Sequence, residues 1–157
     1  MLLKDYVIPR SRITLPGPAV DGQRPYFEVR GITLDDMTFL VNRHIGPITK
    51  AVKMYQESRE DILKTGNLQG FVMTLARDFP DLAAEVISAA SDQLDDETRN
   101  KARQLPISVQ ISALSEITRL SLEDAGGLKN LLAEMRTRIE NAASVGEESN
   151  PARQKNN

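Results

Sequence analysis

The sequence predicts a mainly α-helical protein: a compact bundle of about six short helices with a short N-terminal β-ribbon and a disordered C-terminal tail. Three observations predict this class. Apolar residues recur at spacings of three and four over most of the chain, alternation of apolar and polar residues is confined to about 11–30, and periodicity ends before Ser144. A chain of 157 residues, 40% of them hydrophobic, can bury a core as one domain, residues 1–143, followed by a polar tail, residues 144–157.

Two short strands are expected at residues 12–15 and 25–30, where apolar and polar side chains alternate. The Pro- and Gly-rich segment between them, residues 16–24, is predicted to be a loop. It is too long for a tight hairpin turn, so no turn signal specifies how the strands pair. A lone two-stranded ribbon is marginally stable in water, and we therefore expect it to pack on a helix or on a partner.

The first three helices are expected between this ribbon and Pro80, which begins the fourth helix. Thr33 is placed to cap the first helix. Gly46-Pro47 interrupts it, so a second helix is expected near residues 47–58. Asn67 can cap the third, which ends before Pro80 because the residue preceding a proline disfavours the α conformation.

A short exposed helix is expected at Asp95, and residues 105–139 are predicted to form two helices joined at a capped break. Ser121 and Asp124 provide a capping-box-like start for the second of these. The glycines at 126–127 then fall in its first turn, where each costs about 1 kcal/mol relative to alanine. Something should compensate this cost, and we therefore expect a neighbouring backbone to approach these glycines closely.

The last helix carries the candidate partner-binding residues, an apolar stripe at helical spacing. They are Leu128, Leu131, Leu132, Met135 and Ile139. Such stripes usually belong to a core. Here several short helices each carry one and are broken by glycine and proline, so the alternative of a groove that receives a partner helix stays open.

No residue pattern indicates catalysis, a metal site or a cofactor site. His44 is the only histidine and the chain has no cysteine. His44 therefore has no second histidine and no cysteine with which to bind a metal or to form a catalytic pair. A structural or solvent-exposed role is expected for His44. The glycines match neither the phosphate-loop nor the dinucleotide pattern. We therefore expect that the protein is not an enzyme.

Nucleic acid and membrane partners are not expected either. The formal net charge is −2, and the helix that would enter a DNA groove contains Glu123 and Asp124 where the phosphates would lie, which repels them. No segment approaches the roughly 18 consecutive apolar residues that a membrane span needs.

Three passages resemble the small tail assembly chaperones of long-tailed bacteriophages, also called pre-tape-measure proteins. They are Phe27–Val41, Ala76–Ile87 and Leu105–Gly127, which occur in the order and spacing of that family. The resemblance covers most of Tyr26–Glu134. None of the three is a catalytic motif, because all are packing and capping patterns.

The resemblance implies a non-enzymatic phage factor that keeps the tape-measure protein soluble during tail assembly. The implied partners are the tape-measure protein and the tail tube protein, with self-association left open. The implied location is the host bacterial cytoplasm, with no place in the mature virion. Many relatives also have a longer form made by ribosomal frameshifting, and the polar tail is a natural place for such an extension. Two alternatives stay open: a small helical DNA-binding regulator, and a structural or adaptor protein of the virion tail.

Overall fold

A computed structural model describes residues 1–65, 68–124 and 128–147. After a single 3-10 turn, η1 (Leu3–Asp5), come two strands and six helices. They are β1 (Arg10–Thr14), β2 (Tyr26–Arg30), α1 (Leu34–Thr65), α2 (Leu68–Asp78), α3 (Pro80–Ala90), α4 (Asp96–Gln104), α5 (Ile107–Asp124) and α6 (Leu128–Glu147). Helices account for 70% of the structure, about twice the usual share, so the predicted class of a mainly helical protein with an N-terminal ribbon is confirmed.

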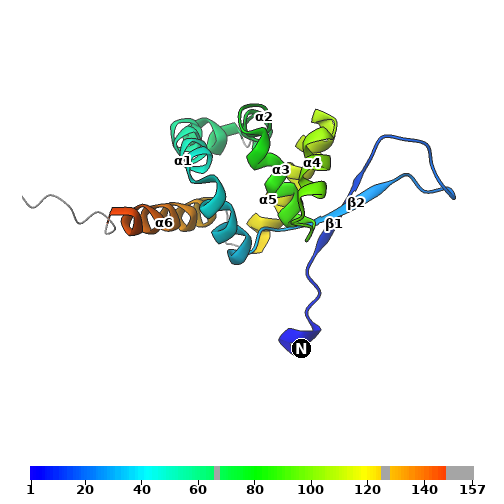
Figure 1. The fold of residues 1–157 in the computed structure, drawn as a ribbon, viewed down its shortest axis with the longest axis horizontal. Helices are drawn as coiled ribbons and strands as arrows, with labels where there is room; N and C mark the ends of the chain where they lie inside the picture. The colour runs from blue at the N-terminus through cyan, green and yellow to red at the C-terminus, as the bar shows by residue number, and fades with distance from the viewer. Residues whose placement is uncertain (66–67, 125–127, 148–157) are drawn as a thin grey trace, which may run out of the picture.

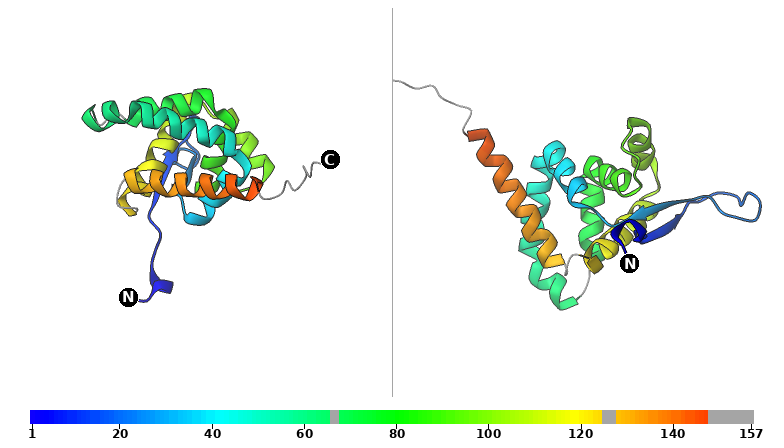
Figure 2. Two further views of the ribbon diagram at one scale, coloured as in Figure 1. Left: turned by 90° about the vertical axis from the view of Figure 1, so that its left-hand side faces the viewer. Right: turned by 90° about the horizontal axis from the view of Figure 1, so that it is seen from below.

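Helices α1 to α5 form the body, and the ribbon and α6 extend from its opposite sides (Figures 1 and 2). Helix α3 lies at the centre, where Ala83, Ala84 and Ala90 are almost fully buried. Small side chains allow neighbouring backbones to approach closely, and α3 contacts α1, α2, α4 and α5. The polar segment between α3 and α5 forms α4, which packs against α3.

The ribbon pairs its two strands in antiparallel register, with Ile13 opposite Phe27. Ile13 and Val29 face inward and join the core beneath α5, as expected for a ribbon that needs a helix to pack on. The loop between the strands closes in a tight two-residue turn, contrary to the expectation of a loop too long for one. Asp21 and Gly22 both have positive φ, 52° and 78°, and Val20 and Gln23 exchange backbone hydrogen bonds of 2.9 and 3.0 Å. This is the Asp-Gly turn whose twist matches that of paired strands.

Ser121 lies inside α5, so the prediction that it begins a new helix is wrong. Its hydroxyl donates to the Ile117 carbonyl at 2.6 Å and accepts from the Ile32 backbone N–H at 2.8 Å. The link from β2 to α1 is thereby fixed to α5. Gly31 provides the close backbone approach there, because a Cβ at this position would lie 3.1 Å from the Leu120 carbonyl carbon. Gly126 and Gly127, where such an approach was expected, lie outside the described residues.

Helix α1 begins as predicted and then differs from the prediction of two separate helices. Thr33 Oγ1 accepts from the Asp36 N–H at 3.2 Å, and Asp36 Oδ2 accepts from the Thr33 N–H at 2.8 Å, which is a reciprocal cap. The helix then continues through Pro47 to Thr65. It is kinked at His44, whose φ of −129° and ψ of 37° are not helical. A proline disrupts the helix in the turn that precedes it, which explains why the kink lies before Pro47.

The later boundaries agree with the sequence at most points. Pro80 begins α3, and Asp95 caps α4 by accepting from the Thr98 N–H at 2.8 Å. Helix α6 runs to Glu147, past the expected start of the tail at Ser144. Asn67 and residues 148–157, which include most of the predicted tail, lie outside the described residues.

Candidate partner-binding surface

Helix α6 packs along α1 through its C-terminal half. Ile139 and Ala142 are partly buried against a cluster of apolar side chains from α1 and α3. Arg138 Nη1 also donates to Thr38 Oγ1 at 2.6 Å. The opposite side of α6 is polar, with Arg136 Nε and Glu140 Oε1 3.0 Å apart across one helical turn.

Of the five predicted partner-binding residues, the structure describes the side chain of Ile139. It is partly buried inside the protein, against α1. The other four occupy the α6 backbone, but their side chains lie outside the described residues: Leu128, Leu131, Leu132 and Met135. Their role in binding therefore stays a prediction.

An apolar cavity of about 140 Å³ lies between α1, α2, α3 and α5. Its walls are almost entirely carbon. The five residues of the cluster on which Ile139 packs also line this cavity: Leu40, Val41, Ile48, Val52 and Leu82. Protein interiors are normally close-packed. The apolar space beside the contact with α6 is therefore large enough to hold further apolar side chains.

A buried carboxylate links three helices, α3, α4 and α1. Glu85 of α3 is 3% exposed, and its oxygens lie 3.2 Å from Arg99 of α4, 3.6 Å from Arg43 and 3.4 Å from His44 Nε2. Two cations compensate the charge of the glutamate. His44 thus has a structural position, at the kink of α1 and in contact with α3.

A second ionic cluster fixes the ribbon to the helices. Arg30, at the end of β2, bonds Asp36 of α1 at 2.5 Å and Asp92 after α3 at 2.6 Å. The hydrogen bond that Arg30 donates to Asp36 raises the pKa of the guanidinium. The hydrogen bond from Arg30, followed by that from Arg10, lowers the pKa of the Asp92 carboxyl against the opposing effect of burial. No local pattern in the sequence distinguished Arg30, because its partners lie 6 and 62 positions away.

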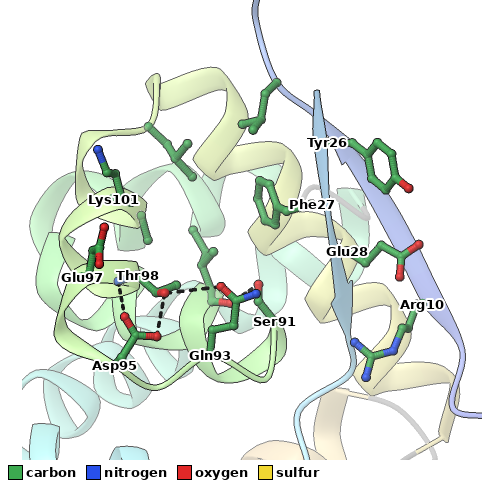
Figure 3. A pocket seen from close by; sticks show the side chains of 14 residues that line it. Arg10, Tyr26, Phe27, Glu28, Ser91, Gln93, Asp95, Glu97, Thr98 and Lys101 are labelled. Carbon is green, nitrogen blue, oxygen red and sulfur yellow. Dashed lines mark hydrogen bonds between the residues drawn. The ribbon is translucent and has the colours of Figure 1, made fainter. Parts of the chain in front are cut away.

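A pocket of about 710 Å³ lies between β2 and the helices α3 and α4, and we call it the ribbon pocket. Figure 3 shows Phe27 pointing into it from β2, with Asp95 and Thr98 on the opposite wall. Its apolar lining is Leu15, Phe27, Ile87, Ala102 and Leu105, and its charged lining includes Glu28, Glu97 and Lys101. These residues come from four separate segments, so no local pattern in the sequence indicated the pocket.

In the part of the chain that the structure describes, no group of three or more His, Asp or Glu side chains could hold a metal ion. Among residues 1–65, 68–124 and 128–147, no helix has the length and apolar character to cross a membrane.

Fold and surface together define a small helical protein with a projecting ribbon, an apolar cavity and a terminal helix packed at the cavity's edge. The family model described as pre-tape measure protein matches residues 1–156, and the chain therefore belongs to the pre-tape-measure protein family. This confirms the resemblance found in the sequence. No curated protein and no solved structure matches the chain. Membership makes it a tape-measure-associated protein of phage tail assembly, in a family that is not a known enzyme family.

Proposed function

We propose that this protein is a tail assembly chaperone that binds the tape-measure protein and keeps it soluble until the tail tube forms around it. The observation that supports this most directly is the apolar cavity of about 140 Å³, whose lining is shared with the contact made by α6. A long helical client exposes apolar side chains every three to four residues. Unfilled apolar space beside the contact with α6 leaves the packing there room to adjust to such side chains without a fixed client sequence.

The binding surface in this proposal is the apolar stripe of α6 together with the α1 residues beside it. Its residues are Leu128, Leu131, Leu132, Met135 and Ile139. Helix-in-groove recognition uses anchors at such spacings. Met37 also lines the cavity, and methionine adapts to partners of irregular shape.

Co-expression with the tape-measure protein tests this proposal. The double variant Leu132→Asp/Met135→Asp should lose co-purification and leave the tape-measure protein insoluble, while its own urea unfolding stays cooperative. The matched control is Ala133→Asp/Thr137→Asp, which adds the same charge at exposed positions of the same helix and should bind normally. Unfolding of the first variant would show that the stripe is core, and unchanged binding would place the site elsewhere.

We further propose that the protein acts in the host bacterial cytoplasm, meets the tail tube protein there, and is left out of the finished particle. Mass spectrometry of purified virions checks this. Detection of the chain in stoichiometric amounts would favour a structural or adaptor protein of the tail instead. A shift of duplex DNA that weakens steeply with salt would favour a regulator.

A further inference from the structure

The N-terminal arm, residues 1–9, is an exposed apolar segment that stands away from the body. Every residue in it is exposed. Met1, Leu3 and Val7 are 100, 89 and 83% exposed, and Tyr6 and Ile8 are nearly half exposed. In Figures 1 and 2 the arm leaves β1 and ends far from the helices. Exposed large apolar side chains gathered on one segment mark an interaction site.

The ribbon pocket has the features that such an arm requires. Its volume of about 710 Å³ lies within the 300–1,000 Å³ or so of typical binding pockets. Phe27, Ile87 and Leu105 give it apolar walls. A strand edge without a partner among the described residues borders it, because within them the sheet has two strands and β2 pairs on one side with β1.

The register of the ribbon shows which backbone groups point toward this edge. Leu15 N–H donates to the Pro25 carbonyl at 2.8 Å. Hydrogen-bonded pairs alternate along an antiparallel ladder, so Phe27 bonds to β1. The N–H and C=O groups of Tyr26 and Glu28 then point away from β1. An extended segment can add there as a third strand.

Charge favours the arm as the occupant. Lys4 and Asp5 are its two charged side chains. The charged lining of the pocket is acidic Glu28, Asp95 and Glu97 and basic Arg10 and Lys101, of which Asp95, Glu97 and Lys101 lie on the wall opposite β2 (Figure 3). An arm with one charge of each sign, next to the apolar run Tyr6–Ile8, complements this lining.

We infer that the arm of one copy docks in the ribbon pocket of a second copy. Arg10, the residue that follows the arm, itself lines the pocket. The arm extends away from the body (Figures 1 and 2), so it would have to change direction to fill its own pocket, whereas docking in a second copy needs no such change. The arm and the pocket are different surfaces, so this contact is head-to-tail and repeats from copy to copy. The inferred contact between copies does not depend on the proposed binding of the tape-measure protein, so either proposal can be refuted while the other stands.

Engineered cysteines test the inference, because the chain has no cysteine of its own. Val7→Cys and Lys101→Cys are made in separate chains, which are mixed and oxidised. The expected product is a disulfide-linked dimer containing the 7–101 bond, identified by mass spectrometry of the peptides. The control mixes Val7→Cys with Lys53→Cys, an exposed position on α1, and should give no 7–53 bond.

Deletion of residues 2–8 gives a second measurement that does not depend on cysteine chemistry. Light scattering of the intact chain, whose monomer is 17.4 kDa, should show oligomers. The deleted chain should fall to the mass of its own, slightly lighter monomer, with an unchanged urea midpoint. The inference is overturned by a monomeric intact chain or by a deleted chain that still oligomerises. A 7–101 bond formed within one chain carrying both cysteines also overturns it, because the arm would then occupy its own pocket.

Discussion

Replacing Arg30 with methionine should destabilise the protein more than any other single loss of a charged side chain at the ribbon. The Arg30 side chain is 8% exposed, and its main partner Asp36 is 9% exposed. Arg30 also donates to the Ala89 carbonyl at 3.2 Å and to the Gly31 carbonyl at 2.9 Å. Methionine keeps much of the length of the arginine side chain but removes all of these donors.

The expected loss follows from the charge that remains. Breaking a buried ion pair by removing one partner costs about 3–5 kcal/mol, because the other charge stays buried and uncompensated. Asp36 keeps its hydrogen bond from the Thr33 N–H at 2.8 Å, so the lower end of that range is expected. A protein of this size is stable by about 5–15 kcal/mol. The variant therefore loses a substantial part of its stability.

Urea unfolding followed by circular dichroism measures the effect. With a denaturant slope of about 2 kcal/mol/M, a loss of about 3 kcal/mol lowers the midpoint by about 1.5 M. The matched control is Arg12→Met. The Arg12 side chain is 65% exposed and pairs with Glu28 at 3.4 Å, so its removal should cost less than about 1 kcal/mol.

A second substitution separates the charge argument from simple loss of packing. Arg30→Met/Asp36→Asn removes the uncompensated charge and should recover much of the lost stability. The reasoning is refuted if Arg30→Met shifts the midpoint no more than Arg12→Met does. It is also refuted if the double variant is less stable than Arg30→Met.

Three other changes give smaller, defined effects. Gly31→Ala places a Cβ 3.1 Å from the backbone of Leu120 and should cost about 1–3 kcal/mol in urea unfolding; an unchanged midpoint would mean that α5 moves away freely. Ile139→Ala removes a partly buried side chain and should cost about 1–2 kcal/mol, whereas no change would deny the packing of α6 on α1. The hydrogen bond from Arg30 lowers the pKa of Asp92, so the unfolded chain binds the proton first and stability falls as the pH drops below about 5. Asp92→Asn should flatten that slope, and an equally steep slope would exclude Asp92 as its source.

The helical elements could be predicted where the signal is local. Thr33 and Asp95 cap their helices through side-chain bonds to residues three positions on, and Pro80 begins α3. The errors occurred where a distant contact decided the outcome. Ser121 has the residue type of a cap, but the Ile32 N–H, far away in sequence, uses its hydroxyl.

The candidate site could be predicted only as a stripe of apolar residues on one helix face. Periodicity cannot say whether such a stripe meets a partner or the protein's own core. The structure shows Ile139 partly buried against α1 and shows a cavity beside it. The ribbon pocket was missed altogether, because Phe27 and Lys101 come to line one pocket only when the ribbon packs on α5 and α3.

The sequence by itself determined the helical class, most helix starts, the two strands and the family, because each depends on residues a few positions apart or on the order of such patterns along the chain. Only the tertiary structure decided the long kinked α1, the internal position of Ser121, the ion cluster of Arg30, the apolar cavity and the ribbon pocket. Burial, ion pairing and cavity shape depend on which segments meet in space, and that choice is made by the packing of the whole chain.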